Sequence, residues 1–177
     1  MPMADIFYNS EFDSPVGKLT LCSNGENLVG LWLKGQKYFM DSVRGFNIIQ
    51  NDNLKIFTDT KMWLVDYFNG FERYPRELAL APIGGEFRQM VWNELCKIPY
   101  GKTITYGELA NRIAKFRGLE KMSAQAVGTA IGHNPISIII PCHRVVGKNG
   151  QLTGYAGGID VKAKLLKLEN VDLEILK

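Results

Sequence analysis

Three short stretches near the start of the chain have the hydrophobic pattern of β-strands. They are residues 6–12, 19–23 and 28–33. The pair Asn24-Gly25 between the second and third is typical of a tight turn, so a small antiparallel meander is predicted. After it, residues 54–69 carry apolar side chains at helical spacing and stop at Gly70, a residue type that commonly ends helices. The first part of the chain is therefore expected to combine a short sheet with one helix.

In the second half of the chain, apolar residues recur mainly at helical spacing. Residues 86–97 predict one helix. Thr105, followed three residues later by Glu108, has the form of a capping box and predicts a second short helix. Ser123 can cap a third helix over residues 124–131, whose small side chains would let it approach another surface closely.

The second and third of these helices have the layout of a helix-turn-helix, but the fit is incomplete. Their connector, residues 115–122, is longer than the usual turn of about 3–4 residues. A plain pair of helices that packs a core therefore stays open as the alternative. A last helix is expected over residues 161–170, with Asp160 as its cap and a glycine-rich loop, residues 153–158, before it.

The densest apolar run of the chain leads directly into a reactive tetrapeptide. Residues 136–140 end in three consecutive isoleucines and predict a buried strand, which Pro141 interrupts. Cys142 follows, and then the titratable His143 and the permanent cation Arg144. Both favour a thiolate, and a core strand needs neither of them. Cys142 is therefore interpreted as a reactive thiol rather than as a small buried hydrophobic residue.

The fold class predicted from these patterns is α/β. The domains are residues 1–80, a small N-terminal α/β domain with a short antiparallel sheet; 81–85, a linker; and 86–177, a helical C-terminal domain. Charge divides in the same way: residues 1–86 hold 8 Lys and Arg against 11 Asp and Glu, a net −3, and residues 87–177 hold 13 against 7, a net +6. The basic half, which carries the thiol, suits a polyanionic partner such as nucleic acid.

Composition excludes several classes of protein. A hydrophobic content of 46% with 22% charged residues is that of an ordinary globular protein, and no apolar run approaches the roughly 18 residues of a membrane span. The start of the chain lacks the basic and apolar regions of a signal peptide, so a cytoplasmic protein without a membrane partner is expected. Three separated cysteines and two histidines predict reduced thiols, no disulfide framework and no metal site.

Several motifs of the C-terminal half resemble one protein family. Asn134-Pro135, the run IIIPCHRVV over residues 138–146, TYGELA before it and GYAGG after it closely resemble the O6-alkylguanine-DNA alkyltransferases, also called methylated-DNA-protein-cysteine methyltransferases. The match is strong from about Phe87 to Glu169, whereas the N-terminal half fits by layout. The resemblance implies a DNA repair protein, with a winged-helix-like helix-turn-helix domain that binds alkylated double-stranded DNA and flips O6-alkylguanine out of it. The alkyl group of that base, or of O4-alkylthymine, then moves irreversibly to the cysteine, in a monomer that needs no cofactor.

The resemblance also implies roles for individual residues. The implied catalytic residues are Cys142, His143, Glu169, Asn134, Tyr106 and Lys162. Those implied to line the substrate pocket are Tyr155, Ala156, Gly157 and Gly158. Those implied to contact DNA are Ser123, Gln125, Ala126, Gly128, Thr129 and Arg144. In this scheme Cys142 gives its proton through a water to His143, which Glu169 orients. Tyr106 protonates the departing guanine, and Asn134 ties the cysteine segment to the helix-turn-helix.

Two features depart from the family pattern. Gln125 stands where the family usually has an arginine that fills the gap left by the flipped base, and it lacks the planar charge of a guanidinium. The longer connector carries Lys115, Arg117 and Lys121. Phosphate contacts and simple solvation account equally well for these three cations.

Two rival functions are weighed against alkyl transfer. The first is an alkyltransferase-like sensor that flips the damaged base without repairing it, but such proteins replace the cysteine, and Cys142 is present. The second is a cysteine hydrolase, for which the sequence offers no adjacent base geometry and no evident oxyanion hole. Transfer to the protein itself is the function that the sequence favours.

Overall fold

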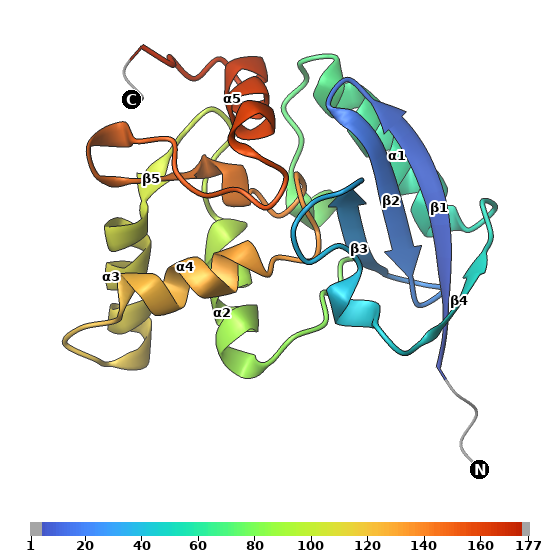
Figure 1. Cartoon of the computed structure of the whole chain (residues 1–177), viewed down its shortest axis with the longest axis horizontal. Coiled ribbons are helices and arrows are strands. Elements are labelled where there is room, and N and C mark those ends of the chain that lie inside the picture. Colours follow the sequence, from blue (N-terminus) through green and yellow to red (C-terminus); the bar gives the residue numbers. More distant parts are fainter. Residues whose placement is uncertain (1–4, 175–177) are drawn as a thin grey trace. The chain divides into compact units, whose positions relative to one another are not determined.

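The computed structural model describes residues 5–174, and these divide into two compact units (Figure 1). The first unit holds the chain as far as Ile83, joined by the short segment Pro135–Ser137. The second unit holds Gly84–Asn134 and the chain from Ile138 onward. The chain therefore leaves the second unit for three residues just before the cysteine motif.

A four-stranded sheet forms the first unit. Its strands are β1 (Ile6–Ser14), β2 (Gly17–Ser23), β3 (Leu28–Leu33) and β4 (Asn47–Gln50). They lie in the order β3-β2-β1-β4, with β4 parallel to β1 and the other neighbours antiparallel. The predicted meander is confirmed. The fourth strand was not predicted, because with Asn47 and Gln50 at its ends it is too short and too polar for a clear alternating pattern.

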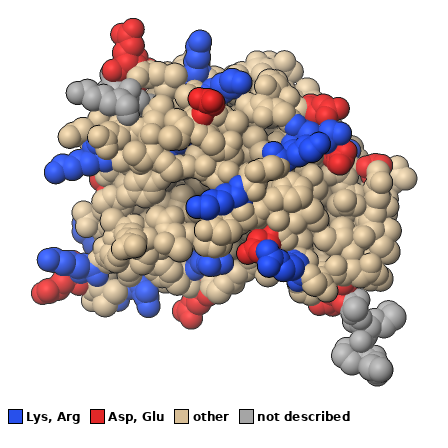
Figure 2. All heavy atoms as spheres, in the orientation of Figure 1, with Lys and Arg blue, Asp and Glu red and all other residues tan. Residues whose placement is uncertain are grey.

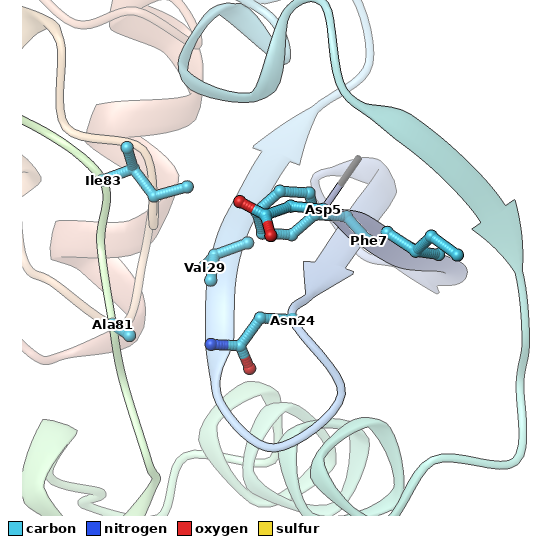
Figure 3. A pocket seen from close by; sticks show the side chains of 7 residues that line it. Asp5, Phe7, Asn24, Val29, Ala81 and Ile83 are labelled. Carbon is cyan, nitrogen blue, oxygen red and sulfur yellow. The ribbon is translucent and has the colours of Figure 1, made fainter. Parts of the chain in front are cut away.

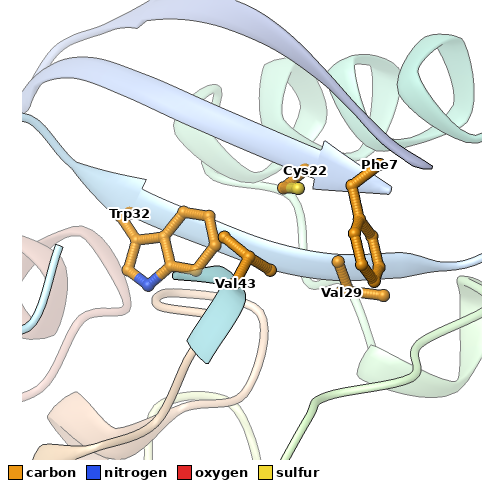
Figure 4. Close-up of a cluster of buried hydrophobic side chains, with 5 residues drawn as sticks. All are labelled: Phe7, Cys22, Val29, Trp32 and Val43. Atoms are coloured by element: carbon orange, nitrogen blue, oxygen red, sulfur yellow. The ribbon is translucent and has the colours of Figure 1, made fainter. Parts of the chain in front are cut away.

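Two sets of buried side chains stabilise this sheet. Helix α1 (Lys55–Phe68) contacts β1 and β2, and its Trp63 and Tyr67 stack with ring centroids 5.4 Å apart. A second buried cluster consists of Phe7, Cys22, Val29, Trp32 and Val43 (Figure 4). A cavity of about 400 Å³ in the same unit is lined by Asp5, Ile6, Phe7, Asn24, Val29, Ala81 and Ile83 (Figure 3). No thiol or imidazole is among the residues that line this cavity.

The second unit is built of helices with one very short sheet. Its elements are α2 (Glu86–Leu95), β5 (Ile104–Thr105), α3 (Tyr106–Arg117), α4 (Ala124–Gly132), β6 (Val145–Val146) and α5 (Ile159–Leu168). Strands β5 and β6 pair in parallel. Trp92 of α2 is buried and donates from Nε1 to Ala130 O of α4 at 2.9 Å, which fixes these two helices together. The predicted fold class, a small sheet-containing N-terminal domain followed by a helical domain, is confirmed.

The expected strand over residues 136–140 is wrong. Within it, Ile136 makes an isolated bridge to Leu31 of the first unit, and Ile138 adopts the left-handed conformation with φ of 72°. A β-branched residue in that region is strained by about 1–3 kcal/mol, so the surrounding contacts must hold it there. The isoleucines are buried as their sequence suggests. An apolar run predicts burial, but it cannot distinguish a strand from another buried conformation.

Two of the three predicted helix caps are confirmed. Thr105 Oγ1 accepts from Glu108 N at 3.1 Å, and Glu108 Oε2 accepts from Thr105 N at 2.7 Å, which completes the capping box of α3. Ser123 Oγ accepts from the backbone N–H three residues later and caps α4. The cap assigned to Asp160 is wrong, because α5 begins one residue before it and a glycine occupies the cap position.

We expect Thr105→Ala to lower the free energy of unfolding by about 1 kcal/mol, because Glu108 N loses its acceptor at the start of α3. Urea denaturation of the natural and variant proteins measures the difference. Thr105→Ser keeps the hydroxyl and is the matched control, which should unfold at nearly the same urea concentration as the natural protein. Equal stability of the alanine variant would show that this capping box contributes nothing to α3.

Candidate active site

The segment that carries Cys142 is held by hydrogen bonds rather than by strand pairing. Pro141 has φ −83° and ψ 64°, the conformation of an inverse γ-turn, and Cys142 N donates across it to Ile140 O at 2.8 Å. Asn134 Nδ2 donates to the same carbonyl oxygen at 2.9 Å. A single 3₁₀ turn, Cys142–Arg144, follows and ends at β6. The proline suits this arrangement because its ring fixes φ near the required value.

The Cys142 thiol is almost completely buried, with 6% of the residue exposed. Burial raises the pKa of the thiol above its ordinary value, while a hydrogen bond from the Asn134 side chain and the positive charge of Lys162 lower it. Because burial is the largest of these effects, the thiol keeps its proton at neutral pH. Nucleophilic attack by this sulfur therefore needs a base that removes the proton.

A buried imidazole adjacent in the chain is suited to act as that base. His143 is fully buried, and its Nε2 lies 2.6 Å from Oε2 of Glu169, which is 2% exposed. A carboxylate only accepts hydrogen bonds, so Nε2 carries the proton and Nδ1 of the neutral ring is an acceptor. Within residues 5–174, Nδ1 is buried without a hydrogen-bond partner. His143 therefore presents a basic nitrogen that no described protein group occupies.

The two members of this pair are held in different charge states. Burial lowers the pKa of His143, and the positive charges of Arg144 and Lys162 also lower it, whereas Glu169 raises it. Burial by itself would raise the pKa of Glu169, but the charges and hydrogen bonds of His143 and Arg144 hold it well below its usual range. At neutral pH, His143 is thus an uncharged base that an ionised carboxylate orients.

Arg144 lies inside the unit. It is 3% exposed, its Nε donates to Glu169 Oε1 at 2.8 Å, and its Nη1 donates to Ile98 O at 2.7 Å. Two protein acceptors sequester the guanidinium, which argues against the DNA contact expected for Arg144. The positive side chain that lowers the thiol pKa is Lys162, and not Arg144 as the sequence suggests.

Lys162 joins the cysteine segment to the glycine-rich loop before α5. Its Nζ donates to Val145 O at 2.6 Å, to Thr153 O at 3.0 Å and to Gly154 O at 3.3 Å. Burial lowers the pKa of Lys162 to about 8, although the charge of Cys142 acts to raise it. The buried ammonium therefore anchors the loop, and its charge interacts with that of Cys142.

Tyr106 begins α3 and reaches the same loop. Its hydroxyl donates to Thr153 O at 3.0 Å, and the centre of its ring lies 5.9 Å from Lys162 Nζ. Burial raises the pKa of Tyr106, and the charge of Cys142 acts in the same direction. The hydroxyl thus keeps its proton and lies close enough to the sulfur for their charges to interact.

The glycine-rich loop contributes a second aromatic hydroxyl. Tyr155 Oη is buried and has no hydrogen-bond partner in the described part of the chain. Burial raises the pKa of Tyr155 well above its usual value, and the charges of Cys142 and Glu169 raise it further. Three small residues follow it, the half-buried Ala156 and Gly157 and the exposed Gly158. The φ of 98° at the last of these is a conformation that favours glycine.

Helix α4 presents an exposed side made of small and uncharged residues. Its exposed members among the residues implied to contact DNA are Ser123, Gln125, Ala126 and Thr129. Gly128 is half-buried, and a Cβ at this position would lie 3.9 Å from the Tyr106 ring, an ordinary van der Waals distance, so the packing against α3 does not require a glycine there. Lys and Arg side chains are dispersed over the viewed face of the molecule (Figure 2). On this face the charged side chains alone therefore do not mark a binding surface.

Two groups at the site belong to residues that the sequence does not single out. Gly101 N donates to Glu169 Oε1 at 3.1 Å, and Ile98 supplies the carbonyl that binds Arg144. Both lie in the turn between α2 and β5, where the sequence indicates only the end of a helix. Their partners are distant in the chain, so no local pattern identifies them.

The other two cysteines are not suited to the same chemistry. Burial raises the pKa of Cys22 to about 12 and that of Cys96 to about 11, and the nearby Arg144 offsets only part of the effect at Cys96. Among residues 5–174, no group of three His, Cys, Asp or Glu side chains could hold a metal ion. None of the helices in that range has the length and apolar character needed to cross a bilayer.

Two family models together match most of the chain. The model described as 6-O-methylguanine DNA methyltransferase, ribonuclease-like domain, matches residues 7–82, and the DNA binding domain of the same name matches residues 86–171. The methylated-DNA--protein-cysteine methyltransferase of Methanosarcina barkeri is 44% identical over 168 residues, which cover 94% of this chain and 99% of that protein. The Haemophilus influenzae protein of the same name is 38% identical over 164 residues, covering 93% and 87%.

Solved structures of similarly named proteins share the fold. Mycobacterium tuberculosis OGT in complex with DNA superposes with a TM-score of 0.77 at 39% identity, covering 93% of this chain and 92% of that one. An O6-methylguanine DNA methyltransferase from Methanococcus jannaschii gives a TM-score of 0.64 at 27% identity, covering 92% and 94%. The resemblance carried by the sequence motifs is confirmed. The chain belongs to the 6-O-methylguanine DNA methyltransferase family.

Proposed function

We propose that the chain repairs double-stranded DNA by direct reversal, with Cys142 taking an alkyl group from O6 of guanine or from O4 of thymine. The observation that carries this proposal is the buried thiol followed by an uncharged imidazole that a carboxylate orients. A thiolate is the soft, strong nucleophile that in-line attack on an O-alkyl group requires. Membership of the family supports the same chemistry.

The reaction starts with the proton of the thiol. His143 Nδ1 is the acceptor, and a water between it and the sulfur of Cys142 carries the proton across. As positive charge develops on the imidazole, the ionised Glu169 stabilises it through Nε2. The charge of Lys162 stabilises the thiolate that forms.

In the transfer step, the sulfur–carbon bond forms as the carbon–oxygen bond of the alkylated base breaks. The electron pair of the broken bond stays on the guanine, which receives a proton from the Tyr106 hydroxyl. The proton that His143 took from the thiol returns through solvent to the tyrosine, so the proton lost by the thiol is the one gained by the guanine. In the free protein this hydroxyl donates to Thr153 O. A bound base takes the place of Thr153 O as the acceptor of this hydrogen bond. The thioether left on Cys142 has no easy leaving group, so each protein molecule reacts once and needs no cofactor.

Helix α4 is proposed to lie against the duplex, because its exposed side is small enough for close approach to a groove. Gln125 on this side is proposed to enter the space left by the flipped base. Lys115 and Arg117 lie in the last turn of α3, and Lys121 lies in the connector that follows it. All three are exposed, and these cations suit contacts to flanking phosphates. Every residue in this scheme comes from one chain, so a monomer is the proposed acting form.

We expect Cys142→Ala to abolish alkyl transfer and to leave DNA binding within a few-fold, because the thiol supplies chemistry and α4 supplies contacts. The measurement follows a labelled methyl group from O6-methylguanine in a duplex, together with the Kd for that duplex. At most one label per molecule should appear on the natural protein, and on Cys142. Cys22→Ala and Cys96→Ala are controls that should transfer normally, because burial keeps both thiols protonated.

The same experiment separates the rival functions. Label released into water would indicate a hydrolase, and DNA binding by the natural protein without any transfer would indicate a lesion sensor. Label on Cys22 or Cys96 in the Cys142→Ala protein would contradict the assignment of the acceptor.

We expect Gln125→Arg to speed repair in duplex DNA and to leave the reaction with free O6-benzylguanine nearly unchanged. A guanidinium can stack in the gap and offset part of an unstacking cost of about a few kcal/mol, whereas the free base needs no flipping. Gln125→Ala should slow duplex repair and likewise spare the free base. The measurement is a pair of single-turnover rates for each protein. Equal duplex rates for all three proteins would show that Gln125 does not occupy the gap.

We expect Lys162→Met to lower the free energy of unfolding by about 1–3 kcal/mol, because Val145 O, Thr153 O and Gly154 O lose a shared donor. The reaction with O6-benzylguanine should also slow, since the loop that forms the pocket wall loses its anchor. Lys164→Met, which removes an exposed lysine from the same helix, is the matched control. Urea denaturation and single-turnover rates that are equal for the two variants would argue against the anchoring role.

A further inference from the structure

The carboxylate of Glu169 is bound on both of its oxygen atoms. Oε2 accepts from His143 Nε2 at 2.6 Å, whereas Oε1 accepts from Arg144 Nε at 2.8 Å and from Gly101 N at 3.1 Å. Two of these three donors lie outside the relay of thiol, imidazole and carboxylate. Because the carboxylate is rigid, the direction in which Oε2 points depends on what holds Oε1.

Arg144 is itself fixed by groups that take no part in the relay. Its Nη1 donates to Ile98 O at 2.7 Å, and the guanidinium carbon lies 5.7 Å from the centre of the Tyr100 ring. Both groups come from the turn between α2 and β5. A planar guanidinium with two donors engaged defines the position of a carboxylate more tightly than a lysine ammonium does.

We propose that Arg144 and the backbone N–H of Gly101 are positioning groups for the transfer reaction. They hold Oε1 of Glu169, so that Oε2 orients His143 with Nδ1 as the free base. The inference rests on the proposed function and adds two groups to it. It also gives Arg144 a role that fits its burial, in place of DNA contact.

The charge of Arg144 has a separate effect from its geometry. After the larger effect of burial, Arg144 helps to lower the pKa of His143. Loss of this cation therefore raises the pKa of His143, so that the base is protonated and inactive at a higher pH than in the natural protein. The other titratable groups that interact with this cluster are Cys96, Cys142, Tyr155 and Lys162. All four side chains are retained in a variant of Arg144, and the pKa of Cys96, which Arg144 lowers, rises further when the cation is lost.

The test measures single-turnover rates with free O6-benzylguanine against pH, so that DNA binding does not enter the result. The proteins are the natural chain, Arg144→Met, Arg144→Lys and Lys167→Met. Lys167 is an exposed cation in the last turn of α5, and its replacement controls for the loss of one positive charge. Circular dichroism and thermal melting report whether each variant is folded.

Arg144→Met is expected to react on the order of 100-fold more slowly. As the pH is lowered, this variant should lose its activity at a higher pH than the natural protein does. Arg144→Lys keeps the charge but not the two-donor geometry, so its rate should fall less and its acid limb should stay in place. Lys167→Met should match the natural protein in both respects.

A folded Arg144→Met protein with the natural rate and acid limb would overturn the proposal. A lower rate with an unshifted acid limb would also overturn it, because a purely structural role predicts that result. If Arg144→Met does not fold, Arg144→Lys decides, and the natural rate in that variant refutes the positioning role. A natural protein that transfers no alkyl group would instead refute the proposed function.

Gly101 allows a test that changes no charge. Its φ is 75°, and a Cβ there would lie 3.0 Å from Glu169 O, so Gly101→Ala must shift the turn and weaken the bond to Oε1. We expect about a 10-fold slower reaction with an unmoved acid limb. Gly118→Ala is the matched control, because Gly118 has φ of 66° but no atom within 4 Å of an added Cβ. Equal rates for the two alanine variants would exclude Gly101 as a positioning group.

Discussion

The buried negative charge of Glu169 is the constraint on which the candidate site depends. A carboxylate that leaves water is destabilising unless cations and hydrogen bonds compensate for its lost hydration. Here the compensation comes from two other parts of the chain, since Gly101 lies before β5 and His143 and Arg144 lie in the 3₁₀ turn. The C-terminal unit must fold correctly to bring these donors together. The contacts that stabilise the buried carboxylate of Glu169 also orient the His143 imidazole.

Burial raises the pKa of the Cys142 thiol and lowers the pKa of the His143 imidazole. It favours the neutral form of both, which leaves Cys142 protonated and His143 free to accept a proton. A protonated, buried thiol is a poor nucleophile toward small reagents, whereas proton transfer to the imidazole produces a thiolate beside Lys162. Under the proposed function, this combination spares the acceptor thiol until a substrate is bound.

Much of the fold could be predicted from the sequence, because the relevant signals are local. The turn at Asn24-Gly25 and the capping box of Thr105 with Glu108 involve residues within three positions of each other. The adjacency of Cys142 and His143 is likewise visible in the chain and indicates reactive chemistry. Where local signals conflict with packing they fail, as at Ile138, whose β-branched side chain favours a strand but whose backbone is left-handed.

The helices, three of the four strands of the first sheet and the cysteine motif are predictable from local sequence patterns, and the resemblance to a family supplies most of the residues that build the site. How those residues face one another depends on the folded arrangement of segments that are distant in the chain. Glu169 meets His143 across 26 positions and Gly101 across 68, and Arg144 turns inward because a buried carboxylate requires a cation. No local pattern specifies such contacts, since they depend on where α5 and the turn before β5 come to lie after folding.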